Sequence, residues 1–341
     1  MNSPVCMGVI GAGWFASRRH LPEIKRNPDT RLAGICRRDR QALDKLQETF
    51  EADKIYTEWR EMLEDSALDA VLIATPHNLH FEPAKAALEH GLHVLLEKPM
   101  TVYAEEAREL EQMAMERGLK LSTALNPPFW AHTHRLRSAI RDGRIGKLEA
   151  MNIFWTGNAG YAFGQAPRPD NLPGVVPPTM YRSDPELCGG GYLIDGGSHL
   201  ISEILWLSDL RAVQVSCIMD NVPSDRRAVV TLKLENDAIA SVICLGDSQS
   251  GERRVRNTFA GSDGTITVEG FDFNTSVQTR SGKLESFTEK DLPPVTGPIT
   301  NFTNAILERE PLHSSTAHGV HVVEIIEAAY RSATTGEIVR L

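Results

Sequence analysis

The chain has 341 residues, of which 41% are hydrophobic and 24% are charged, proportions typical of soluble globular proteins. Because a single hydrophobic core rarely grows beyond roughly 250 to 300 residues, this length predicts two domains. The formal net charge of −9 argues against broad binding to nucleic acids or anionic membranes, both of which require basic surfaces. It does allow a locally positive pocket for an anionic cofactor.

Targeting signals and cysteine usage point to a cytoplasmic protein. The sequence has no apolar stretch of about 18 residues, so we expect no transmembrane helix. The first residues, Met1 to Pro4, lead directly into a β-rich run, so we expect no signal peptide. The five cysteines lie far apart without a Cys-x-x-Cys pair, and we expect reduced, mostly buried thiols.

The first part of the chain alternates β-rich runs with segments of helical spacing. We expect strands at 5–10, 31–36, 70–75, 93–96 and 119–123, and helices at 14–26, 40–50, 77–90 and 103–117. Strands that alternate with helices of about ten to fifteen residues predict a doubly wound parallel sheet.

The pattern changes after residues 142–146. We expect an irregular Gly/Pro-rich stretch at 157–178, helices at 189–207, 301–308 and 317–332, and strands at 148–155, 212–219, 227–234, 238–245, 255–260 and 265–268. A run of adjacent strands predicts an open, largely antiparallel sheet. The predicted fold class is therefore α/β: a doubly wound domain at residues 1–124, then an α+β domain at 125–341 whose last helices pack back on the first domain.

A glycine motif follows the first expected strand. Residues 11–16, Gly-Ala-Gly-Trp-Phe-Ala, fit the pattern G-x-G-x-x-A and open a helix within a βαβ unit. Gly11 permits the tight turn, Gly13 lets backbone amides approach a pyrophosphate, and Ala16 allows the helix to pack closely on the sheet. This context predicts a dinucleotide-binding site.

The end of the second strand indicates which dinucleotide binds. NAD sites usually carry an acidic residue there, but this chain has Arg37 followed by Arg38. A guanidinium suits the 2′-phosphate of NADP(H), which is therefore the favoured cofactor. NAD(H) stays open, because Asp39 or Asp44 can take the acidic role while both arginines remain solvated.

Glu97-Lys98-Pro99 follow the apolar run 93–96. Ligands bind beyond the carboxyl ends of parallel strands, so a lysine there directs its ammonium group at the ligand. Pro99 keeps Lys98 out of the helical region, so the strand does not continue directly into a helix. The simpler alternative is a surface lysine in a turn.

Residues 189–199 combine three glycines with an Asp–His pair. If the segment is helical from Tyr192 onward, Asp195 and His199 share one face. A neighbouring carboxylate orients an imidazole, which can take a hydroxyl proton as hydride leaves carbon. The small residues allow close packing against a ligand or another backbone. The alternative is a pair that only stabilises the helix, and two such ligands are too few for a metal site.

The motifs, in this order, resemble the Gfo/Idh/MocA family (glucose-fructose oxidoreductase, inositol dehydrogenase, rhizopine catabolism) over nearly the full chain. The resemblance is carried by 11–16, by His20-Leu21-Pro22, and by segments 74–80, 91–99, 143–146 and 189–199. It implies a Rossmann domain and a mixed α/β domain whose open sheet often mediates oligomers, so we expect a homodimer or homotetramer.

The resemblance also implies residue roles. Lys98, Asp195 and His199 converge near the nicotinamide, with His199 as the acid/base and Asp195 orienting it. Because lysines are ordinarily protonated at neutral pH, we expect Lys98 to hydrogen-bond the reacting oxygen rather than to act as the base. In relatives the following Lys-Pro peptide bond is often cis. The expected cofactor contacts are Gly11, Gly13, Trp14, Phe15, Ala16, Arg37, Arg38, Thr75, Pro76, His77, His80, Glu97 and Lys98.

Three positions depart from the family pattern. Ser202 stands where relatives often have an acid, Arg37 replaces the NAD-type acid, and Pro127 to Trp130 follow Asn126 where many relatives carry a polar or basic residue. Candidate pocket-lining residues are Trp130, Trp155, Tyr161, Phe163, Tyr181 and Arg182. Of these, Tyr161 and Arg182 are expected to bind substrate together with the three catalytic residues; ordinary packing is the alternative.

The sequence thus predicts an NAD(P)-dependent oxidoreductase. The expected reaction moves a hydride between nicotinamide and a ring CH–OH or C=O of a sugar, a cyclitol or a related polyol. Two alternatives stay open: a non-catalytic dinucleotide sensor on the same fold, and a dehydrogenase of a non-sugar substrate such as a dihydrodiol.

Overall fold

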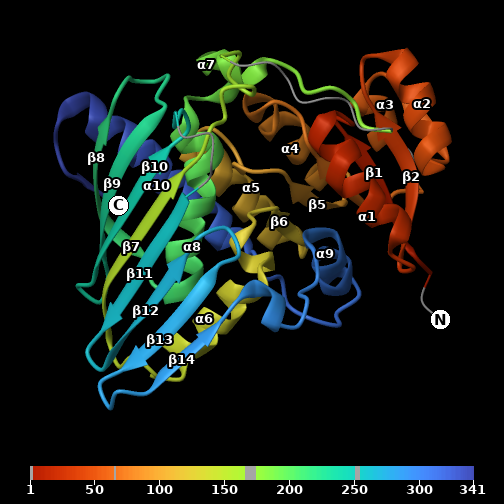
Figure 1. Cartoon of the computed structure of the whole chain (residues 1–341). Helices are drawn as coiled ribbons and strands as arrows, with labels where there is room; N and C mark the ends of the chain where they lie inside the picture. The colour runs from red at the N-terminus through yellow and green to blue at the C-terminus, as the bar shows by residue number, and fades with distance from the viewer. Residues whose placement is uncertain (1–2, 65–66, 166–173, 250–253) are drawn as a thin grey trace. The chain divides into compact units, whose positions relative to one another are not determined.

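The computed structural model describes residues 3–64, 67–165, 174–249 and 254–341 (Figure 1). Part of the stretch expected to be irregular, 166–173, lies outside the described residues. Within the described ranges the chain forms two compact units. The first comprises residues 1–124, 161–188 and 296–320, and the second comprises 125–160, 189–295 and 321–341.

The described part of the first unit contains a parallel sheet, as predicted, but it has six strands, because β3 joins the five that the sequence indicated. Its order is β3-β2-β1-β4-β5-β6. The strands are β1 (Val5–Ile10), β2 (Thr30–Cys36), β3 (Lys54–Tyr56), β4 (Ala70–Ile73), β5 (His93–Leu96) and β6 (Leu121–Thr123). Val9, Leu72 and Val94 are fully buried, as expected where helices cover both faces. Because β1 pairs with both β2 and β4, the strand order reverses there, which is where such sheets bind ligands.

The helices of the first unit follow the apolar spacing of the sequence. They are the π-helical turn η1 (Ala16–His20), α1 (Leu21–Arg26), α2 (Arg40–Phe50), α3 (Trp59–Leu63), the 3-10 turns η2 (His77–Leu79) and η4 (Tyr181–Ser183), α4 (Phe81–Glu89), α5 (Ala104–Arg117), α7 (Pro185–Cys188) and α9 (Pro298–Ile306). Asp39 caps α2 by accepting a hydrogen bond from the Ala42 amide at 3.1 Å. The helix expected at 14–26 is not uniform, because a π-helical turn precedes α1.

The second unit is built on an open sheet of nine described strands in the order β14-β13-β12-β11-β7-β10-β9-β8-β15. The strands are β7 (Leu148–Thr156), β8 (Ala212–Met219), β9 (Arg227–Leu234), β10 (Ile239–Leu245), β11 (Arg254–Gly261), β12 (Gly264–Glu269), β13 (Asn274–Thr279), β14 (Leu284–Phe287) and β15 (Val339–Arg340). The prediction of a largely antiparallel sheet is confirmed. The one exception among the described pairings is β7, which runs parallel to β10.

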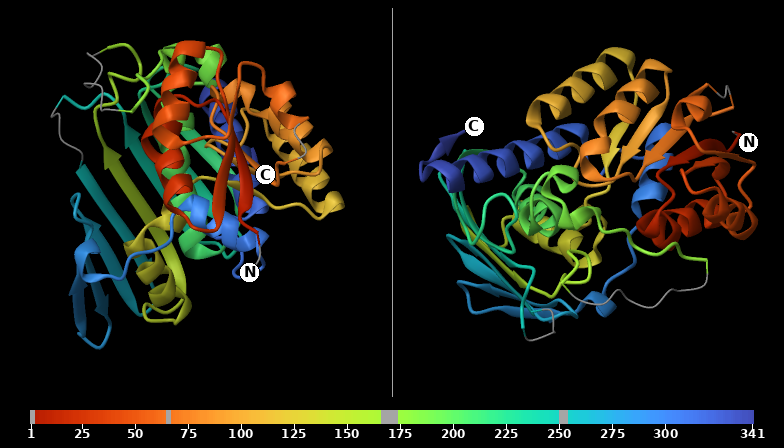
Figure 2. Two further views of the ribbon diagram at one scale, coloured as in Figure 1. Left: turned by 90° about the vertical axis from the view of Figure 1, so that its right-hand side faces the viewer. Right: turned by 90° about the horizontal axis from the view of Figure 1, so that it is seen from above.

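Helices in the second unit cover one face of this sheet (Figure 2). They are α6 (Ala131–Arg141), α8 (Ser198–Ser208) and α10 (Thr316–Thr335), the last beginning in the first unit, with short turns η3 (Pro127–Phe129), η5 (Leu193–Gly197) and η6 (Glu289–Asp291). α8 packs on β7 and β10 and is buried along most of its length. This helix carries His199, so the sheet fixes the position of that side chain.

All five cysteines are free thiols, and four of them are buried. Burial raises the pKa of Cys36 and of Cys217 to about 12, so these thiols serve as packing groups rather than nucleophiles.

Of the helices in the described ranges, none is both long and apolar enough to cross a bilayer.

Candidate active site

The glycine loop after β1 has the backbone that a dinucleotide site requires. Gly11 has φ of +82°, and a Cβ placed on it would lie 2.7 Å from the Ala74 carbonyl carbon, so no larger residue fits. The amides of Gly11 and Ala12 donate to the Cys36 carbonyl at 3.0 and 3.1 Å. A Cβ on Gly13 would meet nothing closer than 3.7 Å, so this side of the loop is open to a ligand.

Arg37 lies across this loop. Its Nη1 donates to the Ala12 carbonyl at 3.3 Å, and its Nη2 is 4.0 Å from the Asp39 carboxylate, which also caps α2. The Nε atom of Arg37 is buried without a hydrogen-bond partner among the described residues. An unsatisfied buried guanidinium nitrogen beside an open glycine loop fits an anionic group of a bound dinucleotide. Arg38, in contrast, is exposed.

Aromatic rings flank the start of the first helix. The Trp14 ring contacts Phe15 and Tyr161, with centroids 6.3 and 6.1 Å apart. Phe15 in turn lies edge-on to His20, with centroids 5.4 Å apart. Tyr161 belongs to the first unit, so this residue, predicted to bind substrate, stands beside the predicted cofactor loop.

His80 connects the ends of two neighbouring strands. Its Nδ1 is 2.8 Å from the Pro99 carbonyl, beyond β5, and its Nε2 is 3.0 Å from the Thr75 carbonyl, beyond β4. Burial lowers the pKa of His80 and outweighs the hydrogen bonds to Pro99 and Thr75, which act in the opposite direction. Thr75 also donates its hydroxyl to the Leu79 carbonyl at 2.9 Å. The segment 75–80 is therefore held by its own polar groups.

His77 anchors the segment that carries Arg182. Its Nδ1 is 2.8 Å from the Cys188 carbonyl, and its Nε2 is 3.1 Å from the Tyr181 hydroxyl. The Arg182 guanidinium lies 4.6 Å from the centroid of the Tyr181 ring. Through these contacts the predicted substrate residue Arg182 is placed near the predicted cofactor residue His77.

Glu97 and Lys98 are both buried at the end of β5. The Glu97 carboxylate lies 2.6 Å from His20 Nε2 and accepts a hydrogen bond from the Lys98 amide at 3.2 Å. Burial alone would raise the pKa of Glu97, but the hydrogen bond from His20 and the charges of His20 and Lys98 outweigh it, so the pKa falls below its usual value. Lys98 is only 9% exposed, and the Lys98–Pro99 bond is cis, as the resemblance implied. The simpler alternative of a surface lysine is thus excluded.

Asp195 and His199 belong to the second unit. Asp195 lies in η5, a π-helical turn, and His199 in the first turn of α8. The segment is therefore helical as expected, but a π turn precedes the α-helix, and such turns occur frequently at functional sites. The Asn126 amide donates to His199 Nδ1 at 3.2 Å, and its Nδ2 lies 3.3 Å from Nε2. Asn126 thus orients the imidazole, a role that the sequence did not reveal.

Asp225 fixes the glycine segment ahead of Asp195, and it too was missed. This fully buried carboxylate accepts hydrogen bonds from the Gly191 and Leu193 amides at 3.2 and 2.8 Å and from the Tyr330 hydroxyl at 2.6 Å. A Cβ on Gly191 would lie 2.1 Å from the Asp225 carbonyl oxygen. The expected close packing of the small residues is therefore against another backbone. No local motif marks Asp225, because it lies 34 and 32 residues away in the sequence from the Gly191 and Leu193 amides that it binds.

The two groups of predicted catalytic residues belong to different units. Lys98 lies in the first, whereas Asp195 and His199 lie in the second. Their convergence around a substrate stays a prediction. Ser202, where relatives often have an acid, is fully buried, and the next residue, Glu203, is buried as well. Asn257 on β11 donates to Glu203 at 3.0 Å, and burial raises the pKa of Glu203 to about 8.

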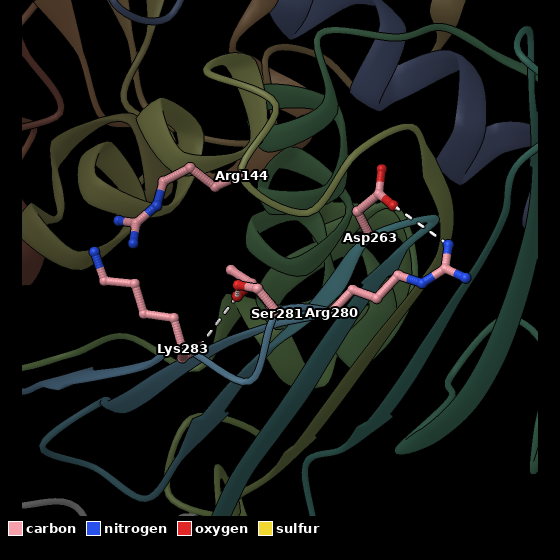
Figure 3. A pocket seen from close by; sticks show the side chains of 6 residues that line it. Arg144, Asp263, Arg280, Ser281 and Lys283 are labelled. Carbon is pink, nitrogen blue, oxygen red and sulfur yellow. Dashed lines mark hydrogen bonds and ion pairs between the residues drawn. The ribbon is translucent and has the colours of Figure 1, made fainter.

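A surface pocket of about 390 Å³ lies in the second unit, beside the strands β12 to β14 of the open sheet (Figure 3). It is lined by Arg144, Asp263, Thr279, Arg280, Ser281 and Lys283, none of them a predicted site residue. Arg144 pairs with Glu285 at 2.6 Å and Arg280 with Asp263 at 3.9 Å. With its arginines neutralised in this way, the pocket is not assigned to the reaction.

Within the described ranges, no group of three or more His, Cys, Asp or Glu side chains is arranged to hold a metal.

The first unit is a parallel sheet with a glycine loop at its switch point. The second is an open sheet on which the largely buried helix α8 carries His199. This combination is typical of two-part dinucleotide-binding oxidoreductases. Residues 5–125 match the model of the oxidoreductase family with an NAD-binding Rossmann fold, and residues 133–267 match the GFO/IDH/MocA C-terminal domain. The chain belongs to the Gfo/Idh/MocA oxidoreductase family.

Individual relatives are distant. The chain is 28% identical to D-glucoside 3-dehydrogenase of Escherichia coli over 62% of this chain and 56% of that protein. It is 24% identical to an NADP⁺-linked scyllo-inositol 2-dehydrogenase of Bacillus subtilis over 96% and 93%. The structure of levoglucosan dehydrogenase with NADH superimposes with a TM-score of 0.83 at 19% identity, covering 99% of both chains. The chain spans about half the length of several of the curated relatives it matches.

Proposed function

We propose that this protein is an NADP(H)-preferring oxidoreductase that interconverts a ring CH–OH and C=O of a sugar, cyclitol or related polyol. The observation that carries the cofactor assignment is Arg37, whose guanidinium crosses the glycine loop with its Nε unsatisfied. The names of relatives that act on glucosides, inositols and levoglucosan support a polyol substrate.

The proposed cofactor residues are those of the first unit. Gly11 and Gly13 give the pyrophosphate access to backbone amides, and Arg37 with Arg38 pairs with the 2′-phosphate. Trp14, Phe15 and Ala16 open the helix behind the loop; Thr75, Pro76, His77, His80 and Glu97 line the ends of β4 and β5. When bound, the nicotinamide supplies the hydride acceptor or donor.

The proposed chemistry uses one proton and one hydride. In the oxidation direction, His199 takes the proton of the substrate hydroxyl while the hydride leaves the same carbon, and the carbonyl forms. Asp195 stabilises the charge that His199 acquires. Lys98 hydrogen-bonds the reacting oxygen and stabilises its developing negative charge. Tyr161 and Arg182 bind the remainder of the substrate. The buried Glu97–His20 pair keeps a negative charge next to the Lys98 backbone.

The remaining assignments complete the proposal. We assign NAD(P) binding to the domain built on residues 1–124, which segments 161–188 and 296–320 join, and substrate binding and oligomerisation to the rest of 125–341, in a cytoplasmic homodimer or homotetramer. Two alternatives share the fold: a dinucleotide sensor and a dehydrogenase of a non-sugar substrate such as a dihydrodiol. The retention of Lys98, Asp195 and His199 favours catalysis over sensing.

A two-stage experiment tests this function. NADPH and NADH are titrated against the protein by fluorescence, and a panel of sugars, cyclitols and dihydrodiols is then screened for a change in absorbance at the nicotinamide band. Tighter NADPH binding and turnover of a polyol are expected. Binding without turnover of any compound would favour the sensor, and turnover of a dihydrodiol alone would favour the non-sugar enzyme.

A further inference from the structure

Four aromatic rings gather in the second unit. Two of them belong to the candidate pocket-lining residues of the sequence, Trp130 and Trp155, and none of the four takes part in the proposed chemistry. They are Trp130, which follows η3, Trp155 on β7, and Phe271 and Phe273 in the turn between β12 and β13. Neighbouring centroids are 6.4 Å apart for Trp130–Trp155 and for Trp155–Phe271, 6.3 Å for Phe271–Phe273 and 5.7 Å for Phe273–Trp130. The two Trp rings are parallel to within 5°. We call this set the aromatic platform.

The register of the open sheet places Trp155 on the same face as the helix that carries His199. Asn257 on β11 faces α8, because its amide donates to Glu203 of that helix at 3.0 Å. Ile153 on β7 pairs with Asn257 and therefore shares its face. Trp155 lies two residues further along β7, so its ring projects to this side as well.

The short turn η3 connects the platform to His199. Asn126, which contacts both nitrogens of His199, precedes the turn, and Trp130 follows it. At about 2 Å of rise per residue, this turn separates the backbones of Asn126 and Trp130 by roughly 8 to 10 Å. The Trp130 amide donates to the Pro127 carbonyl at 3.2 Å, so the spacing is fixed by the turn itself.

The two phenylalanines of the platform are not placed as ordinary core residues. Phe271 is 53% exposed, which is costly for a large apolar ring at a hairpin turn. Phe273 has φ of +50°, a left-handed conformation that bulky residues rarely adopt and that Asn or Gly adopts readily. Strained residues of this kind persist mainly at functional sites.

The platform is rigidly supported and has polar groups beside it. Glu289 accepts hydrogen bonds from the amides of Ala131 and His132 at 3.0 and 2.9 Å, and its carboxylate lies 2.7 Å from His132 Nδ1. The His132 ring stacks on Phe273 with centroids 3.8 Å apart, and its Nε2 is buried without a partner among the described residues. Asp272, which stands between the two phenylalanines in the sequence, pairs with Lys290 at 3.3 Å.

We propose that the aromatic platform is a subsite for a second sugar ring, so that the substrate is a glycoside of at least two rings rather than a free monosaccharide. The apolar C–H face of a pyranose packs on aromatic faces, and the exposed side chains of Asp272 and Lys290 are the polar groups available to its hydroxyls. The proposal rests on the proposed function, because it assumes that the reacting ring binds at His199.

The test compares one-ring and two-ring ligands on the protein loaded with NADP⁺. Dissociation constants are measured by calorimetry for cellobiose, maltose and lactose, and for the methyl glucosides and methyl galactoside as one-ring counterparts. The double variant Phe271→Ser/Phe273→Asn removes two rings and places at residue 273 an amino acid suited to positive φ, so no loss of thermal stability is expected. Tyr103→Ser, which removes an exposed ring from the first unit, is the matched control.

The wild-type protein is expected to bind at least one disaccharide about tenfold more tightly than its one-ring counterpart. The double variant is expected to lose this advantage while its affinity for the one-ring sugar and for NADP⁺ is unchanged. The proposal is overturned if no disaccharide has an advantage, if the double variant retains it, or if the variant dissociates on size exclusion, which would make the platform a contact between copies. The same titrations are repeated without cofactor: if NADP⁺ does not bind but the disaccharide advantage is still measured, the proposed function is refuted and the subsite stands.

Discussion

Glu97 Oε1 and His20 Nε2 lie 2.6 Å apart, although 77 residues separate them in the sequence. The pair joins the helical turn that follows the glycine loop to the end of β5, so the loop and Lys98 are positioned by one buried interaction. Breaking it leaves a buried charge or an unsatisfied imidazole, both of which cost stability.

Glu97→Gln tests this pair through its pH dependence. Because the pKa of Glu97 is lowered in the folded protein, its contribution to stability is present above the unfolded pKa of about 4.3 and is lost as pH falls through the folded pKa. The free energy of unfolding of the wild type is therefore expected to exceed that of the variant at pH 7, with the difference shrinking below pH 4. Urea unfolding from pH 3 to 7 measures this. Glu48→Gln, at an exposed position, is the control, and a constant difference would contradict ionisation of Glu97.

Lys98→Met and His199→Ala are expected to lower turnover by roughly 10²- to 10⁴-fold, because each removes a group that handles the proton or charge on the reacting oxygen. NADPH affinity is expected to change little. Steady-state kinetics and fluorescence titration measure the two effects separately. His90→Ala changes an exposed histidine and should have no effect. Wild-type turnover in either site variant would refute the mechanism.

Arg37→Ser is expected to weaken NADPH binding by about 10- to 100-fold, the loss of a charge-assisted contact, while NADH binding stays nearly unchanged. The ratio of the two dissociation constants is the measurement. Arg38→Ser provides the comparison, because Arg38 is exposed and a smaller effect is expected. An equal loss for both nucleotides would show that Arg37 holds the loop and does not recognise the 2′-phosphate.

Glu203→Gln is expected to stabilise the protein at high pH. The folded state holds the Glu203 proton up to pH about 8, whereas the unfolded chain releases it near pH 4.3, so wild-type stability falls between these values. Glutamine keeps an oxygen for the Asn257 amide and does not titrate. Thermal melts at pH 5 and pH 9 should show a larger gain at pH 9. Equal shifts at both values would contradict a protonated Glu203.

Asp225→Ala is expected to destabilise the fold by about 3 to 5 kcal/mol, because two buried amides and the Tyr330 hydroxyl lose their acceptor. Tyr330→Phe removes one of these donors and should cost about 1 kcal/mol. Urea unfolding gives both values. If Asp225→Ala costs no more than Tyr330→Phe, the carboxylate does not anchor the glycine segment.

Much of the fold could be predicted because its signals are local. The strand at 5–10 and the helix at 40–50 have the predicted bounds, since apolar periodicity and the Asp39 cap specify them. β13 and α6 were missed because the residues that define them are remote. β13 reads Asn-Thr-Ser-Val-Gln-Thr and is a strand because β12 pairs with it. The polar helix α6 is capped at its start by Glu289, far along the chain.

The site shows the same division. The glycine loop, Arg37 and Lys98 lie at strand ends that periodicity locates, so they could be named from the sequence. Asn126, Asp225 and His20 act through partners that lie 32 to 105 residues away in the sequence, and no spacing rule connects such pairs.

The segmentation of the two units limits how this protein can be taken apart. The chain passes from one unit to the other five times, at residues 124, 160, 188, 295 and 320. A cut after residue 124 would leave behind two later segments of the first unit, with α9 and the stretch that carries Tyr161. An isolated nucleotide-binding fragment or a single-junction chimera is therefore expected to fail, and exchanging specificity between relatives requires grafting side chains onto the intact chain.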